Sequence, residues 1–455
     1  MRTLAAGLWL GLAACAACAA CAAGAEFHPS DFGARGDGKT LDTAAIQKTI
    51  DAAAKRGGTV VLAGGTYLSG AVFLKSGVNL RIEEGATLVG SQRLADYPIL
   101  ETRVAGVEMK WPAALINVYQ QHDVSLSGKG IADGDGKVWW DLYWKMRRGD
   151  YEPKGLRWAV DYDCQRPRLI QIYRSENVRV EGLTLKRSGF WTVHICYSRH
   201  VAVEAITIRN NEGGRGPSTD GVDIDSSNGI TVANCDIECN DDAICLKAGR
   251  DADGLRVAKP TENVTIRDNT VRAGAAGVTF GSETSGGIGN VQVLGGRVLA
   301  GVPVGILFKS ASTRGGTIDN IRIRDLVMEG VGTVFAVAFN WNPSYSYAKI
   351  PEGMKNVPSY WRVLAEPVPP EKGLPHLRNV AISDIRATGA RQAFSVASYK
   401  DSPLANFKFD DWQIEVRSAG SIQNAENWEF TETQIHTADG SRVAVKDSTG
   451  VTGLP

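Results

Sequence analysis

The sequence predicts an all-β fold, a right-handed parallel β-helix (a solenoid of stacked coils) with a short N-terminal capping helix. Short apolar segments with a period of two recur along the middle of the chain. No helical pattern of about 10–15 residues separates them, which argues against a doubly wound sheet or a barrel with helices. Glycine is abundant, at 51 of 455 residues, and is spread along the chain as many tight turns would require.

The first element in the chain is a targeting segment, residues 1–25. Its apolar run, 4–14, is too short to span a bilayer, and the Ala-Gly-Ala at 23–25 fits a signal-peptide cleavage site. The segment Leu-Ala-Ala-Cys at 12–15 also fits a lipoprotein signal, cut before Cys15 and then lipidated. Both readings stay open. They predict a secreted or periplasmic protein, or one anchored to the outer membrane by lipid, with no later membrane span.

We expect residues 27–455 to form a single β-helix catalytic domain whose N-terminal end is capped. Residues 42–54 read as an amphipathic helix, since Ile46 and Ile50 lie four apart among alanines. Such a helix would cover the open end of the core and block edge-to-edge pairing of strands.

The coils themselves are marked by repeated strand starts. The segment 177–185 has apolar residues at its second, fourth, seventh and ninth positions, and 200–208 repeats this frame. Each unit is short and β-branched with one buried face, and it can bury that face only by stacking on its neighbours. Successive starts fall 23–34 residues apart, at Val178, Val201, Ile230, Val264, Val291 and Ile321.

Two long segments, 136–168 and 340–371, interrupt the repeat of strands and are rich in tryptophan and tyrosine. Loops of this length in a compact fold are usually functional. Their aromatic rings either stack on sugar rings or pack on one another, and the sequence leaves both readings open.

The overall charge and the cysteine content of the chain limit the kinds of partner and cofactor that we expect. The chain has 50 basic and 50 acidic residues with no charged tail, so no nucleic-acid partner is expected. After cleavage at residue 25, five cysteines remain, an odd number; we read them as buried core residues, with a local disulfide as the alternative. Their spacing matches no zinc pattern, so we expect no metal and no cofactor.

Aligning the coils brings carboxylates together. The segments starting at Asp220 and Asp242 place Val222 beside Ile244, and burial fixes this register because a slip by one residue would expose every apolar side chain. Asp220 then lies beside Asp242 at the ~4.8 Å spacing of parallel strands, with Asp241 displaced by one step. The aligned inward rows are Val222, Ile244, Val278, Ile306 and Ile224, Leu246, Phe280, Phe308.

Lysines accompany these acids: Lys309 lies on the same strip two coils on, and Lys247 lies in the coil of Asp242. Neighbouring carboxylates raise one another's proton affinity and form a candidate acid–base site. The sequence shows no Ser-His-Asp grouping and no phosphate-binding glycine loop. Three clustered acids therefore point to glycoside hydrolysis, in which one acid protonates the leaving oxygen and the others activate a water.

At these residues the chain resembles glycoside hydrolase family 28, the polygalacturonase family. Ser218-Thr219-Asp220-Gly221 is similar to the family's Asn-Thr-Asp motif, and Asn240-Asp241-Asp242 to its paired aspartates. The segments 189–194, 281–287 and 308–310 resemble further family motifs. The resemblance implies an inverting hydrolase with Asp241 as general acid and with Asp220 and Asp242 positioning and activating water.

The resemblance also implies a substrate, α-linked galacturonic acid in a pectic poly- or oligosaccharide. Exo action is expected because the two long loops could close one end of the cleft, and the enzyme is expected to be a monomer. The candidate substrate-binding residues are Lys309, Lys247, Glu283 and His194. Glu283 could instead cap a turn, and His194 beside Trp191 could be a packed residue.

Two departures from the family bear on this substrate. Ala275 stands where the family has the histidine of Gly-His-Gly, and Leu307 where it has the arginine of Arg-Ile-Lys. An apolar leucine makes a less acidic neighbouring sugar, such as the rhamnose of rhamnogalacturonan, more credible. The alternatives are a pectin or rhamnogalacturonan lyase on the same fold and a non-catalytic carbohydrate-binding β-helix.

Overall fold

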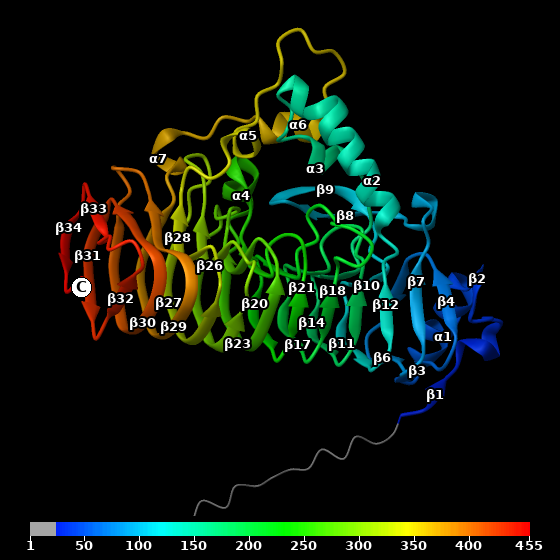
Figure 1. Ribbon diagram of the computed structural model, residues 1–455. Helices are drawn as coiled ribbons and strands as arrows, with labels where there is room; N and C mark the ends of the chain where they lie inside the picture. Colours follow the sequence, from blue (N-terminus) through cyan, green and yellow to red (C-terminus); the bar gives the residue numbers. More distant parts are fainter. Residues whose placement is uncertain (1–23) are drawn as a thin grey trace, which may run out of the picture.

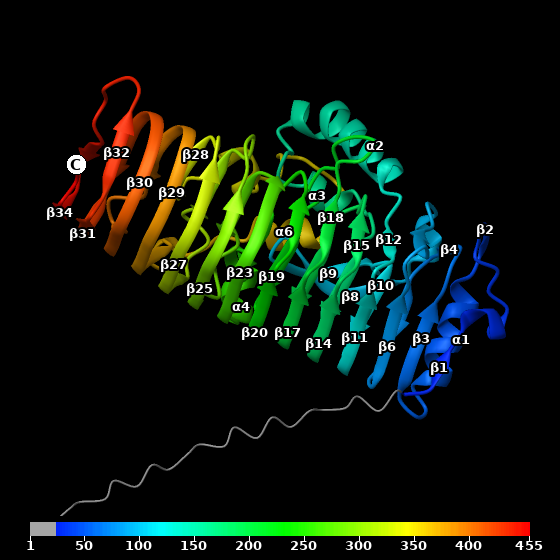
Figure 2. The same ribbon diagram turned by 60° about the horizontal axis from the view of Figure 1, so that its bottom comes forward.

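The computed structural model describes residues 24–455, so the predicted targeting segment and its lipoprotein alternative lie almost wholly outside the described residues. The chain forms a parallel β-helix, as predicted, in which almost every strand pairs in parallel with the equivalent strand of the next coil. Figures 1 and 2 show the coils stacked in chain order, with the N-terminal end of the described chain at one end of the solenoid and the C-terminus at the other.

Three ladders of strands make up the coils. The first ladder carries the candidate site and contains β5 (Val72–Leu74), β10 (Ile116–Tyr119), β13 (Ile170–Tyr173), β16 (Val193–Cys196), β19 (Val222–Asp225), β22 (Ile244–Lys247), β24 (Ala276–Phe280), β26 (Val304–Lys309) and β28 (Thr333–Ala338).

The second ladder faces the viewer in Figure 2. It contains β1 (Glu26–Phe27), β3 (Gly58–Leu62), β6 (Val78–Ile82), β11 (His122–Gly128), β14 (Glu176–Glu181), β17 (Arg199–Glu204), β20 (Asn228–Ala233), β23 (Thr261–Ala273), β25 (Ile288–Val298), β27 (Thr317–Glu329), β31 (Ala425–Thr431) and β34 (Thr449–Thr452).

The third ladder is shorter, because from β23 onward its strands merge with those of the second. It contains β2 (Asp37–Leu41), β4 (Thr66–Ser69), β7 (Thr87–Gly90), β12 (Ile131–Asp133), β15 (Thr184–Lys186), β18 (Thr207–Arg209), β21 (Asp236–Glu238) and β32 (Gln434–Thr437). In the last coils, β29 (His376–Ala397) and β30 (Leu404–Gln423) run through all three ladders, and β33 (Ala444–Lys446) ends the first.

The predicted register is confirmed. Val222 pairs with Ile244, Ile244 with Val278 and Val278 with Ile306, and the second predicted row pairs in the same way. These side chains are buried in one continuous core. Toward the C-terminus the core becomes aromatic, with stacked rings such as Phe409 on Phe430 at 4.5 Å.

The N-terminal cap is also confirmed. The helix α1 (Thr43–Ala53) buries Ile46 and Ile50, and it contacts β3, β5 and β6 at the end of the solenoid. The short helix η1 (Pro29–Phe32) precedes it and packs on it.

Both long interruptions contain short helices. The first holds α2 (Lys137–Met146), η3 (Arg147–Tyr151), η4 (Glu152–Lys154) and α3 (Val160–Asp163), and the second holds α5 (Pro343–Ser346), α6 (Ser359–Leu364) and α7 (Pro370–Gly373). Their aromatic residues contribute to a second apolar cluster, in which Trp158 and Trp361 lie 4.9 Å apart.

Two further insertions were not anticipated. The short helix η2 (Leu94–Asp96) leads into an antiparallel hairpin of β8 (Ile99–Val104) and β9 (Val107–Pro112), and α4 (Asp251–Val257) follows β22. The elements α4, α6 and β9 contact one another, so the insertions from distant coils meet on one side of the solenoid (Figure 1). No helix within residues 24–455 is long and apolar enough to cross a membrane.

Candidate active site

A cavity lies where the insertions cover the first ladder. Its floor comes from the starts and ends of β19, β22 and β26, and its walls come from the two long insertions and the β8–β9 turn. The lining residues are Ala105, Arg157, Asp161, Phe190, Trp191, Ser218, Asp220, Asp241, Asp242, Lys247, Ser282, Glu283, Lys309, Trp341 and Tyr345.

The backbone brings the three predicted acids together. The Gly221 N–H donates to the Asp242 carbonyl at 2.9 Å, which stacks the coil of Asp220 directly on that of Asp242. A Cβ at Gly221 would lie 2.3 Å from the Ala243 carbonyl oxygen, so only glycine allows this close approach. One oxygen from each of Asp220, Asp241 and Asp242 lies within 4.8 Å of the others.

The three carboxyls differ in their surroundings. Asp242 accepts hydrogen bonds from Lys309 at 2.7 Å and from Thr279 at 3.0 Å. Burial opposes its ionisation, but Lys309 and Lys247 together hold the pKa of Asp242 below its usual range. Burial and the neighbouring acids raise the pKa of Asp241, and they raise that of Asp220 well above its usual range. The cluster therefore contains carboxyl groups whose pKa values are shifted in opposite directions, as acid–base chemistry requires.

The predicted lysines both reach this cluster, and both are about 4% exposed. Lys309 pairs with Asp242 and lies over the Trp341 ring at 4.2 Å. Lys247 lies 3.4–3.7 Å from three carboxylates, those of Asp220, Asp223 and Glu283. Lys309 is therefore held by one carboxyl group and an aromatic ring, and Lys247 by three carboxyl groups.

Glu283 lines the cavity as a charged residue. It accepts a hydrogen bond from the Tyr345 hydroxyl at 3.1 Å, and its carboxylate also pairs with Lys247. Burial opposes its ionisation, but Lys247 and Arg314 lower the pKa of Glu283 to about 2, so it is a carboxylate throughout the physiological range.

Asp223 is an acid of this region that the sequence did not single out. It is fully buried beneath the cavity, and neither of its carboxylate oxygens accepts a hydrogen bond within the described part of the chain. Burial raises the pKa of Asp223 to about 7, with Lys247 opposing the rise. The alternation along β19 that identifies the buried row also places Asp223 on the outer face, which is the signal that could have found it.

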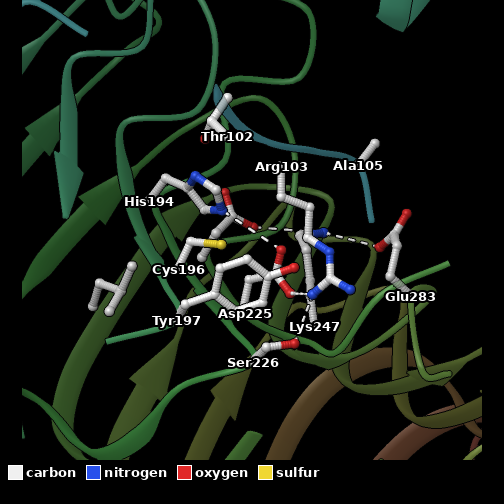
Figure 3. Close-up of polar contacts among 12 residues, drawn as sticks. Thr102, Arg103, Ala105, His194, Cys196, Tyr197, Asp225, Ser226, Lys247 and Glu283 are labelled. Carbon is white, nitrogen blue, oxygen red and sulfur yellow. Dashed lines mark hydrogen bonds and ion pairs between the residues drawn. The ribbon is translucent and has the colours of Figure 1, made fainter. Parts of the chain in front are cut away.

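His194 lies behind the cavity wall rather than in it. Its ring is fully buried, packs edge-on against Trp191 at 4.8 Å and lies 3.7 Å from Asp225 (Figure 3). Burial and the nearby Arg168 lower the pKa of His194 to about 4, so the ring is neutral. It is absent from the cavity lining, and of the four predicted substrate-binding residues only His194 does not reach it.

Within residues 24–455, two groups of side chains have spacings that could hold a metal ion, the three aspartates and His194 with Cys196 and Asp225. In both, a protein cation already lies against a carboxylate. Lys309 contacts Asp242, and Arg103 donates to Asp225 at 2.9 Å (Figure 3). These groups supply the positive charge that a metal would bring, and neither set resembles a preformed metal cage.

The cysteines are buried core residues, as the first of the two readings predicts. The five within the described residues, Cys164, Cys196, Cys235, Cys239 and Cys245, form no disulfide. Cys239 packs directly under the site, and its Sγ lies 3.1 Å from the Asp241 carbonyl oxygen.

The two departures from the family motifs lie beside the cavity. The Ala275 N–H donates to the Asp241 carbonyl at 2.8 Å, so this position supports the backbone of Asp241 rather than providing a ring. Leu307 is 8% exposed and packs with Ala276 and Ala336 in a small apolar strip on the outer face of the ladder.

A parallel β-helix with a buried, charge-paired carboxyl cluster in an open cavity defines a class, that of a glycoside hydrolase built on a solenoid. Residues 60–350 match the model of Glycosyl hydrolases family 28, and the chain belongs to that family.

The chain is similar to proteins described as polygalacturonases and galacturonosidases. A probable polygalacturonase of Vitis vinifera is 30% identical over 322 residues, which cover 68% of this chain and 62% of that one. An exo-poly-alpha-D-galacturonosidase of Dickeya chrysanthemi is 26% identical over 443 residues, covering 88% of this chain and 69% of that one. The crystal structure of a hyperthermoactive exopolygalacturonase from Thermotoga maritima superposes with a TM-score of 0.72 at 26% identity, covering 93% of this chain and 92% of that one.

Proposed function

We propose that this protein is an inverting exo-acting galacturonidase that hydrolyses α-linked galacturonic acid in pectic poly- or oligosaccharides. The observation that carries the proposal is the cluster of Asp220, Asp241 and Asp242, whose nearest oxygens lie within 4.8 Å of one another and in which Asp242 is paired with Lys309. In this proposal, residues 27–455 act as a single catalytic domain.

The surroundings of each acid suggest its role. Asp241, whose pKa is raised by burial and by Asp242 and which is the most exposed of the three, would give its proton to the leaving oxygen. Asp242, held ionised by Lys309, would accept the proton of a water that Asp220 helps to hold. The proton returns to Asp241 through solvent when the product leaves.

The stereochemistry depends on whether water reaches the sugar between the acids. One oxygen from each of the three acids lies within 4.8 Å of the others, close enough for two of them to hold one water molecule between them. The match to Glycosyl hydrolases family 28 supports inversion, because the resemblance to this family implies that Asp220 and Asp242 position and activate water.

Exo action is supported by the closure of the cleft. The β8–β9 hairpin contacts α4 and α6 over the first ladder, and Arg103 of the hairpin pairs with Asp225 of β19. A long polysaccharide could not lie across this end, so the cavity suits the terminal sugar of a chain. Lys247, Lys309 and Glu283 line it and would contact that sugar or the next.

A second substrate, rhamnogalacturonan, is favoured by one observation. The strip of Ala276, Leu307 and Ala336 lies on the outer face of the same ladder, and Leu307, two residues before Lys309, stands where the family resemblance leads one to expect an arginine. A 6-deoxy sugar such as rhamnose presents a methyl group that would bury against this strip, whereas a second uronate would find no cation there.

We also propose that the protein acts outside the cytoplasm, secreted or periplasmic or tethered by lipid, as a monomer in pectin degradation and cell-wall carbohydrate metabolism. The support is the apolar, alanine-rich start of the sequence and the polymeric nature of the proposed substrate. Mass spectrometry of the mature N-terminus separates cleavage after residue 25 from cleavage before a lipidated Cys15.

The test of function is a product assay on polygalacturonan and on rhamnogalacturonan oligosaccharides, with Asp241→Asn as the matched inactive variant. Monomeric galacturonic acid from the wild type alone is the expected result, and the better substrate identifies the neighbouring sugar. An unsaturated product, seen by ultraviolet absorbance, would show a lyase. Binding without turnover would show a carbohydrate-binding β-helix.

A further inference from the structure

One cation of the cavity comes from an insertion rather than from the solenoid. Arg157 lies between η4 and α3, lines the cavity and has a side chain that is 15% exposed. Its Nη1 donates to the Asp161 carboxylate at 2.5 Å, and its guanidinium lies over the Tyr345 ring at 5.1 Å. The Nε is buried without a hydrogen-bond partner, and within the described residues Nη2 has none either.

The charge around Arg157 is not balanced. Its partner Asp161 is shared with Arg166, whose Nη2 lies 3.5 Å from the same carboxylate and whose side chain is fully buried. One carboxylate thus serves two guanidinium groups, which leaves about one positive charge uncompensated at the cavity wall. A surplus buried charge is costly unless an anion pairs with it.

The other two lining cations are differently placed. Lys309 is paired with Asp242, and Lys247 lies among three carboxylates. Both therefore lie within the acid cluster, where a further carboxylate from the substrate would be repelled by the protein's own acids. Arg157 is the lining cation whose surroundings favour an incoming anion.

The position of Arg157 relative to the acids is fixed. Asp161 accepts a hydrogen bond from Ser218 Oγ at 3.1 Å, and Ser218 precedes Asp220 by two residues on the same coil. On the other side, Tyr345 beneath the guanidinium donates to Glu283. The guanidinium is therefore held at a defined place on the wall of the cavity that contains the three aspartates.

We propose that Arg157 binds the carboxylate of the terminal galacturonic acid through its guanidinium group, and so selects an acidic over a neutral terminal sugar. This rests on the proposed function. It also explains how the enzyme would manage with Leu307 in place of an arginine, since the guanidinium that recognises the acid is supplied by an insertion instead. Nη2, which has no partner within residues 24–455, can donate a charge-assisted hydrogen bond to a carboxylate oxygen.

The test compares two ligands that differ only at one carbon, 4-nitrophenyl α-D-galacturonide and 4-nitrophenyl α-D-galactoside. Binding is measured by calorimetry in the Asp241→Asn background, so that no turnover is needed. Arg157→Gln should weaken galacturonide binding about 10- to 100-fold, the effect of charge-assisted hydrogen bonds, and leave galactoside binding unchanged. Arg157→Lys should retain part of the preference.

The matched control is Arg256→Gln, which removes the same charge from an exposed residue of α4 that pairs with Glu108 and Asp253 away from the cavity. It should leave both affinities unchanged. Equal weakening of both ligands by Arg157→Gln would show a merely structural role, and no weakening of either, or no preference in the parent protein, would also overturn the proposal. Failure of the proposed function would appear separately, as absence of turnover by the wild type.

Discussion

Replacing Lys309 by methionine should move the acid limb of the pH–activity profile upward. Lys309 Nζ lies 2.7 Å from Asp242 Oδ2, and both side chains are at most 5% exposed. With the ammonium gone, the ionised form of Asp242 loses its closest positive partner, so its pKa rises. A larger fraction of the enzyme then holds Asp242 protonated and unable to accept a proton from water.

The size of the pKa shift expected for Asp242 follows from its distance to Lys309. At 2.7 Å and an effective dielectric constant of ~20, the Coulomb attraction is about 6 kcal/mol, an upper bound that entering water reduces. Opposite charges at close range usually shift a carboxyl pKa by about 1–3 units, and we expect a shift in that range. Between the wild-type limb and the shifted limb, activity should fall about tenfold per pH unit relative to the wild type, and at lower pH the ratio of the two activities should be constant.

The assay is kcat/KM for release of galacturonic acid as a function of pH, which reports the free enzyme. Lys309→Arg is the control, because it keeps the charge and should keep the limb near its wild-type place. A Lys309→Met enzyme with an unmoved acid limb and only a raised KM would refute the reasoning, since it would mean that Lys309 binds substrate without tuning Asp242.

Three further results are expected. Asp223→Asn should raise the free energy of unfolding at pH 8 but not at pH 4. The folded wild type keeps the Asp223 proton to about pH 7, whereas the unfolded chain releases it near pH 4, so the stability of the wild type falls between these pH values. Equal denaturation midpoints for both proteins at pH 8 would contradict this. Phe409→Ala should lower the free energy of unfolding by about 3–5 kcal/mol, because the ring is fully buried in the C-terminal aromatic stack; chemical denaturation measures it, and a change below about 1 kcal/mol would mean that the stack repacks. Asp241→Asn should lower kcat by about 10²-fold or more while leaving substrate binding near the wild-type level, and a variant that keeps its kcat would remove Asp241 from the role of acid.

The solenoid could be predicted from the sequence because the alternation of buried and exposed residues is a local property of each strand. A strand with one buried face must alternate, and the alternation at Val222 and Ile224 fixes the register with Ile244 and Leu246. The same alternation is sufficient to place Asp220 beside Asp242. The position of Lys309, two coils away, follows from the same rows.

The insertions could not be predicted in the same way, because their course depends on contacts between distant parts of the chain. The β8–β9 hairpin is held by Arg103 and Asp225, which are 122 residues apart in sequence. Arg157 owes its place to Asp161, which bonds Ser218 57 residues later. The prediction that the two long loops are functional rests on their length, and it takes account of their aromatic residues but not of their charged ones.

His194 shows the opposite failure, a residue chosen for its chemistry whose side chain turns out to be covered. It lies in the register row of Asp223, and the row faces outward from the core. The hairpin and the Trp191 ring then enclose it, so exposure could not be deduced from the strand pattern alone.

The most direct test of the account is the anomeric configuration of the galacturonic acid first released from an α-linked substrate, followed by proton NMR before mutarotation. Water activated by Asp242 and held by Asp220 should attack the face opposite the leaving group, and the account predicts the β-anomer. Release of the α-anomer would contradict it, because retention would require a carboxylate of this cluster to form a covalent intermediate.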